Sequence, residues 1–123
     1  MLDHVSIGTR DIAAAKRFYD AALTPLGATC LMSGDGYLAY GTTAPVFWIM
    51  ASTSPVPADP ANGVHFCFTA PSQAAVSGFH RGALAHGGQD NGAPGPRPDY
   101  TPGYFAGFVV DPDGYRLEAH HEG

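Results

Sequence analysis

The fold is decided by the stretch Asp111-Pro112-Asp113-Gly114-Tyr115-Arg116-Leu117-Glu118-Ala119-His120. Its Asp-Pro-Asp-Gly opening predicts a turn, and the residues that follow alternate between polar and apolar as in a β-strand. Arg116, Glu118 and His120 therefore share one face of this strand, and the apolar residues share the other. An ionisable side chain at the centre of a short strand needs a partner, so we expect Glu118 to face one.

The composition indicates one globular domain. The chain has 123 residues, of which 45% are hydrophobic and 14% charged, enough for a core without disulfides. A formal charge of -5, with only six scattered Lys and Arg, argues against a nucleic-acid partner. The longest apolar run, Ala44–Ala51, is too short to span a membrane, and the N-terminus lacks signal-peptide features. Since Cys30 and Cys67 form no disulfide framework, we expect a cytoplasmic protein.

Periodicity and turn residues predict a similar order of elements in two halves of the chain. In the first half, Asp11 is a candidate N-cap, and the elements are a strand at 3–8, a helix at Ile12–Leu23, and strands at 28–32, 37–41 and 46–51. In the second half, Ser72 is the candidate N-cap, and the elements are a strand at 64–69, a helix ending near Ala85, and strands at 104–110 and 115–120. Between that helix and Tyr100 the chain is rich in Gly and Pro, and no strand is assigned there.

Placing the halves 61 residues apart aligns them without a gap for about twenty-four positions. Strand histidine, N-cap, helix aromatic, helix end and following glycine all coincide. The matched pairs are His4 with His65, Asp11 with Ser72, Phe18 with Phe79, Ala22 with Ala83, Leu23 with Leu84, and Gly27 with Gly88. We therefore predict one α+β domain over residues 1–123, made of two βαβββ modules. Module one covers about 1–52, a proline-containing linker about 53–62, and module two about 63–123.

The repeat also predicts a metal site. His4 and His65 hold equivalent places on the first strands of the two modules, opposite the apolar residues that the helices can cover. If the sheets combine into one curved sheet, both histidines and Glu118 face its concave side. Two imidazoles and a carboxylate suit Fe, Zn, Mn, Ni or Co and leave positions open for substrate. The last strand of module one, at 46–51, has no ionisable side chain, so we predict three ligands and no fourth.

Several neighbouring residues keep more than one interpretation. Tyr104 is a candidate catalytic residue because a phenol near a metal can orient or protonate a bound oxyanion, but it also suits an aromatic core. Cys67 fits a small buried residue better than a ligand, and His120 is the first substitute if one ligand is misassigned. Trp48 can line the concave surface or the core. His4, His65 and Glu118 could also be merely hydrogen-bonded together.

Three segments resemble the vicinal-oxygen-chelate superfamily, which includes glyoxalase I, extradiol dioxygenases and bleomycin-binding proteins. They are Leu2-Asp3-His4-Val5-Ser6-Ile7, Gly63-Val64-His65-Phe66-Cys67-Phe68, and Tyr104 to Glu118 with its Asp-Pro-Asp-Gly turn. The resemblance implies a cupped, incompletely closed mixed sheet barrel with the helices outside, and a homodimer. It also implies metal ligands on first and last strands, which maps onto His4, His65 and Glu118.

Two functions follow from this resemblance. One is a metal-dependent isomerase, lyase or dioxygenase acting on a small substrate that chelates the metal through vicinal oxygens, with Glu118 and Tyr104 in catalysis. The other is a metal-free protein that binds a small molecule or drug, as bleomycin-resistance proteins do. The absence of a fourth ligand departs from the glyoxalase I pattern, and fold alone does not fix the activity.

Overall fold

The computed structural model describes residues 1–56 and 59–123. Module one contains β1 (Val5–Thr9), α1 (Ile12–Leu23), the short 3-10 helix η1 (Thr24–Leu26), β2 (Thr29–Gly34), β3 (Tyr37–Gly41) and β4 (Phe47–Ala51). After η2 (Pro60–Asn62), module two contains β5 (His65–Thr69), α2 (Gln73–Ala85), β6 (Gln89–Pro96), β7 (Tyr104–Val110) and β8 (Arg116–Glu122). The predicted linker at about 53–62 includes residues 57 and 58, which lie outside the described residues.

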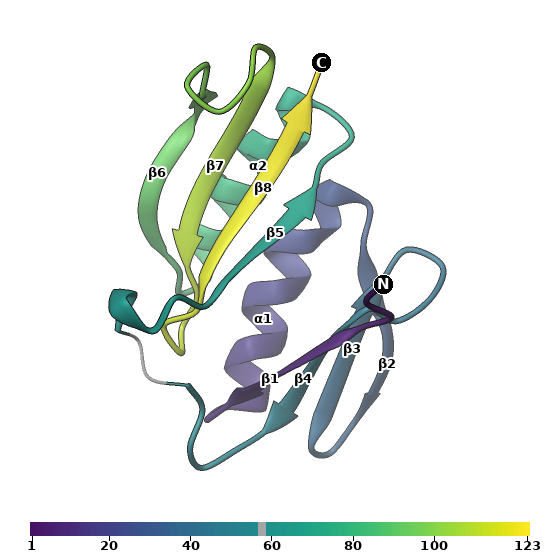
Figure 1. Ribbon diagram of the computed structural model, residues 1–123. Coiled ribbons are helices and arrows are strands. Elements are labelled where there is room, and N and C mark those ends of the chain that lie inside the picture. Colours follow the sequence, from purple (N-terminus) through teal and green to yellow (C-terminus); the bar gives the residue numbers. More distant parts are fainter. Residues whose placement is uncertain (57–58) are drawn as a thin grey trace.

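Each module forms its own four-stranded mixed sheet, with strand orders β1-β4-β3-β2 and β5-β8-β7-β6. The first strand of each module runs parallel to the last, and the other pairs are antiparallel. The two sheets are not closed into a barrel, and β1 and β5 are the strands that each sheet turns toward the other (Figure 1). The predicted α+β fold with two βαβββ modules is confirmed.

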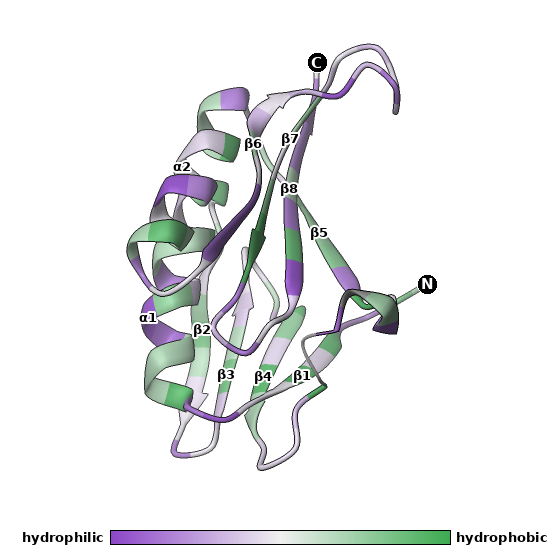
Figure 2. Cartoon of the chain, turned by 90° about the vertical axis from the view of Figure 1, so that its left-hand side faces the viewer, coloured by the Kyte–Doolittle hydropathy of each residue, from purple (hydrophilic) through white to green (hydrophobic). Residues whose placement is uncertain are grey.

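Both helices begin where the sequence predicts. Asp11 accepts a hydrogen bond from the amide of Ala14 at 3.0 Å, and Ser72 accepts one from Ala75 at 3.0 Å. These side chains cap amides that have no partner within the helix. The two helices lie on the same side of the two sheets (Figure 2). No helix among the described residues is long and apolar enough to cross a membrane.

The core lies between the helices and the sheet faces they cover. From module one, Phe18, Tyr19 and Ile49 are fully buried, and from module two Phe79 and Leu117. A single cluster of buried side chains continues across both modules. The helices approach closely at Gly82, where a Cβ atom would overlap the carbonyl oxygen of Ala21. The modules therefore share one core, which neither could close alone.

The strand β6 corrects the assignment of the Gly- and Pro-rich stretch before Tyr100 as non-strand. Within the described part of the chain it pairs only with β7, and its register shifts twice, between Asp90 and Gly92 and between Gly92 and Gly95. An edge strand tolerates proline because one side of it needs no ladder hydrogen bonds, and the irregular register accommodates the glycines. The Gly- and Pro-rich composition of this stretch therefore does not indicate a strand, although an edge position allows one.

The Asp-Pro-Asp-Gly turn joins the two modules. Asp111 is buried and accepts hydrogen bonds from the Tyr19 hydroxyl at 2.5 Å and from the amides of Asp113 and Tyr115, each at 2.9 Å. Asp113 accepts a hydrogen bond from the Thr9 hydroxyl at 2.5 Å. Burial raises the pKa of Asp111, while these hydrogen bonds act in the opposite direction. The turn thus ties the last strand of module two to module one.

Candidate functional site

An acid–histidine pair lies on the face of module two that points away from the helices. The parallel pairing of β5 with β8 sets Cys67 opposite Glu118 and His65 opposite Arg116, so these side chains share one face. The Nε2 atom of His65 lies 3.1 Å from Oε1 of Glu118. Only 4% of Glu118 is exposed, whereas the His65 side chain is 39% exposed, so a ligand can reach the pair from the histidine side.

Tyr104, from the neighbouring strand β7, forms a hydrogen bond with the second oxygen of the Glu118 carboxylate. Its hydroxyl donates a hydrogen bond to Oε2 of Glu118 at 2.6 Å. Burial raises the pKa of the Tyr104 phenol, and the adjacent Glu118 carboxylate raises it further. The phenol therefore stays protonated at neutral pH and holds one carboxylate oxygen in a fixed direction. The other oxygen, Oε1, faces His65.

Cys67 and His120 border this group. Cys67 is exposed, which corrects its prediction as a small buried residue. Partial desolvation of its thiol, together with the nearby Glu118, raises the pKa of Cys67 to about 12, so the thiol is not a reactive thiolate at neutral pH. The His120 ring stacks on Tyr104, with ring centroids 3.8 Å apart. Its buried Nε2 atom makes no hydrogen bond to any described residue and lies 3.5 Å from Oε1 of Glu122.

His4 lies outside this group. It precedes β1, its side chain is 50% exposed, and its Nδ1 atom lies 2.7 Å from a carboxylate oxygen of Asp3. Its ring contacts Trp48 edge-on, with centroids 6.2 Å apart. His4 and His65 do line a common groove of about 400 Å³ between the modules. The structure thus brings His65, Glu118 and Tyr104 together without His4, and the three-ligand site stays a prediction.

The His65–Glu118 pair fits part of a metal site. Two ligand atoms that each lie about 2.1 Å from one ion are about 3.0 Å apart at a right angle and about 3.4 Å apart at the tetrahedral angle. The 3.1 Å separation of this pair falls within that range. Within residues 1–56 and 59–123, however, no three His, Cys, Asp or Glu side chains lie close enough to hold an ion. A metal ion held by this pair would need a third ligand from outside the group.

The sequence predicts no role for Arg97 or Phe108, although both border the pair. Phe108, on β7, stacks near His65 with ring centroids 6.3 Å apart, and the Arg97 guanidinium lies 5.4 Å from the centre of the Phe108 ring. The alternation of β7 places Phe108 on the same face as Tyr104, a signal that could have identified it. Arg97 follows the irregular edge strand, where the sequence gives no period to indicate its direction.

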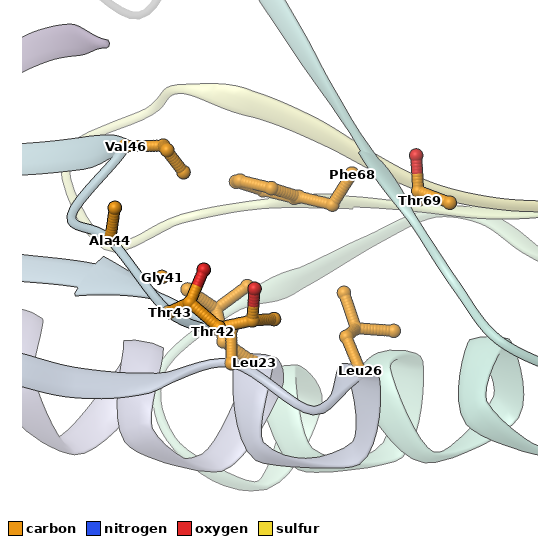
Figure 3. A pocket seen from close by; sticks show the side chains of 10 residues that line it. Leu23, Leu26, Gly41, Thr42, Thr43, Ala44, Val46, Phe68 and Thr69 are labelled. Atoms are coloured by element: carbon orange, nitrogen blue, oxygen red, sulfur yellow. The ribbon is translucent and has the colours of Figure 1, made fainter. Parts of the chain in front are cut away.

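A separate apolar pocket of about 280 Å³ lies where the end of α1, the β3–β4 loop and β5 meet (Figure 3). Leu23, Leu26 and Phe68 line it, and threonine hydroxyls supply its polar side-chain atoms. Of the residues that the structure describes, no ionisable side chain lines it. It therefore lacks groups for acid–base or metal chemistry.

The class of this α+β protein follows from its fold and its site. Two βαβββ modules share one core, and an acid–histidine pair lies on the face opposite the helices. The chain belongs to the glyoxalase/bleomycin resistance protein/dioxygenase superfamily, whose family model matches residues 1–119. No curated protein matches the sequence.

Solved structures agree with this assignment. A glyoxalase/bleomycin resistance protein from Albidiferax ferrireducens T118 is 30% identical, with a TM-score of 0.87 and 99% of each chain covered. A glyoxalase-related enzyme from Fulvimarina pelagi is 18% identical, with a TM-score of 0.73, 98% of this chain covered and 86% of the other. A bleomycin-binding protein in complex with bleomycin is 21% identical, with a TM-score of 0.61, 100% of this chain covered and 99% of the other. The last two similarities concern the fold alone.

Proposed function

We propose that this protein is a metal-dependent enzyme that acts on a small substrate carrying vicinal oxygens. The observation that carries the proposal is the convergence of His65, Glu118 and Tyr104, with 3.1 Å and 2.6 Å between their polar atoms. A buried carboxylate is costly unless it is paired, and one with an open histidine beside it suits ligand binding better than structure.

Each of these residues has a distinct role in the proposed site. His65 and Glu118 bind a divalent metal, which when bound polarises the oxygens of the substrate as a Lewis acid. Tyr104 keeps its proton and fixes the direction of Oε2 of Glu118, so that Oε1 remains directed at His65. The Phe108 ring lies roughly parallel to the His65 ring, with centroids 6.3 Å apart, and forms an apolar border of the site.

The third ligand in this proposal is His4 from a second copy of the chain. His4 is half exposed, and the strand it precedes, β1, has a hydrogen-bonded neighbour in the described sheet on one side only, as does β5. A homodimer that sets β1 of one copy beside β5 of the other would pair these two edges, leave β2 and β6 as edge strands, and supply the missing imidazole. Unpaired edge strands are normally covered in this way or blunted by charge.

Metal analysis of protein purified without chelator tests the proposal. Wild-type protein and a His86→Ala variant should retain the same metal content, because His86 lies at the end of α2 and its side chain bonds the Gly82 carbonyl, away from the pair. Glu118→Ala should lose the metal. Equal metal in Glu118→Ala and wild type would contradict the assignment, and would favour a hydrogen-bonded pair.

A second candidate function is metal-free binding of a planar molecule. It is favoured by an aromatic surface in module one, where Tyr37 and Trp48 lie with ring centroids 6.0 Å apart beside His4. A titration with bleomycin, followed by quenching of Trp48 fluorescence, separates the two functions. Binding that is unchanged by EDTA and by His65→Ala would favour the binding protein over the enzyme.

A further inference from the structure

Beside the acid–histidine pair, module two contains a hollow of about 390 Å³ that two arginines share. Arg97 and Arg116 line it together with His65, Phe108 and Tyr100. The chain has only six Lys and Arg against eleven Asp and Glu, so two guanidinium groups in one hollow are a marked local excess. His65 belongs to both the hollow and the pair, which makes the two sites continuous.

Arg97 is held in place by backbone and aromatic contacts. Its Nη1 atom donates to the carbonyls of Gly95 at 3.0 Å and Pro96 at 3.3 Å, and its Nη2 atom donates to Ala93 at 2.8 Å. The guanidinium also lies over the Phe108 ring. A guanidinium has five N–H donors, so these three hydrogen bonds leave others for a ligand. Its geometry is thus set before a ligand arrives.

Arg116 adds a second guanidinium from β8, two residues before Glu118 on the same face. Its guanidinium makes one hydrogen bond with residues that the structure describes, from Nη2 to the Val64 carbonyl at 2.9 Å. Among the described residues, neither Arg97 nor Arg116 lies within 4.0 Å of a carboxylate oxygen, although Arg10 does. Both positive charges are therefore available to an anion from outside.

The local charge favours a single negative charge over a double one. In the metal-free protein, two guanidinium groups beside the Glu118 carboxylate leave one net positive charge around the hollow. A monocarboxylate neutralises it, whereas a phosphate dianion would be repelled by Glu118. Planar carboxylates also match the forked geometry of a guanidinium.

We propose that this hollow binds the carboxylate of the substrate and that Arg97 and Arg116 are its specificity-determining residues. The substrate class is then a small organic acid with a further oxygen near the carboxylate. The placement of that further oxygen at His65 and Glu118 rests on the proposed function, but the carboxylate site does not.

An NMR titration of EDTA-treated protein tests the hollow without any metal. Lactate is the probe, lactamide its neutral counterpart and inorganic phosphate the dianion. Lactate should shift the amide signals of Asn91, Gly92 and Phe108 saturably, and lactamide should not. Arg116→Gln should weaken lactate binding by about tenfold, the value of one charged hydrogen bond, and Arg97→Gln by at least as much. Arg81→Gln, on the exposed surface of α2, is the matched control and should bind as wild type does.

Three results would overturn the inference: equal binding of lactamide, tighter binding of phosphate than of lactate, or unchanged lactate binding in Arg116→Gln. Arg116→Gln keeps the test valid if Arg97→Gln misfolds, because Arg97 also anchors the backbone of β6. Protein that binds zinc but shows no response to lactate would contradict the proposed carboxylate site and leave the proposed metal site standing. Protein that responds to lactate but binds no zinc would contradict the proposed metal site and leave the carboxylate site standing.

Discussion

The last strands of the two modules occupy equivalent places but carry different chemistry. In module two, β8 sets Glu118 opposite Cys67 of β5, and in module one β4 sets Trp48 opposite Ser6 of β1. Ser6 and Cys67 are themselves equivalent under the 61-residue repeat. The position that holds a buried, hydrogen-bonded carboxylate in one module therefore holds an indole in the other.

The fold determines which way the side chains of β4 and β8 point, whereas the identity of single side chains determines the chemistry on that face. Both strands run parallel to the first strand of their module and direct alternate residues away from the helices. Module two adds Tyr104 and His65 around its acid, whereas module one surrounds Trp48 with His4 and Tyr37. Module two carries the proposed ion site, and module one offers an aromatic surface.

The turn before β8 offers the largest effect on stability. Asp111→Ala should reduce the free energy of unfolding by about 3 kcal/mol, because it leaves two backbone amides and the Tyr19 hydroxyl without their shared acceptor. Urea denaturation measures it. Asp35→Ala, in the exposed β2–β3 turn of module one, is the control and should change little. Equal effects at both positions would show that the module-two turn has no special role.

The contrast between Glu118 and Trp48 predicts the next largest effect. Glu118→Gln should weaken zinc binding at least about a hundredfold, since even the residues behind metal ligands affect affinity by 10–100-fold. Trp48→Phe should leave zinc affinity unchanged, because module one supplies no ligand at this position. Isothermal titration calorimetry measures both. A loss of zinc affinity in Trp48→Phe as large as that in Glu118→Gln would contradict the proposed difference between the two modules.

The contact between the two helices predicts a smaller change of unusual sign. Replacing glycine by alanine inside a helix normally stabilises a protein. Gly82→Ala should instead destabilise this one by about 1–2 kcal/mol, because the added methyl overlaps the backbone of Ala21. The thermal unfolding midpoint measures it, with Arg81→Ala as the control on the exposed side of α2. A raised midpoint for Gly82→Ala would show that the modules pack less closely.

The pKa of Asp111 predicts the smallest effect, a dependence on pH. Burial raises this pKa above its unfolded value, so the folded state binds the proton more tightly than the unfolded state. Its contribution to stability is therefore full below the unfolded pKa of about 3.9 and is lost as pH rises through the folded pKa. The difference in unfolding free energy between wild type and Asp111→Asn should be larger at low pH. A difference that grows with pH would have the wrong sign.

The sequence predicted what depends on local pattern. Asp11 and Ser72 locate the starts of both helices, and the alternation of β8 separates the Glu118 face from the buried Leu117 face. The sequence did not predict the strand β6, because its Gly- and Pro-rich composition is tolerated only through its position at the edge of the sheet. It also could not predict how the two sheets lie relative to each other, because alternation gives the direction of His4 but not its distance from Glu118.

Mixing two defective variants tests the shared metal site most directly. His4→Ala and Glu118→Gln should each bind zinc weakly, and each keeps the residue that the other lacks. If the site combines His4 of one copy with His65 and Glu118 of another, unfolding and refolding the two variants together should restore a fraction of tight zinc sites. Calorimetry that finds only weak binding in the mixture, as in each variant alone, would contradict the account.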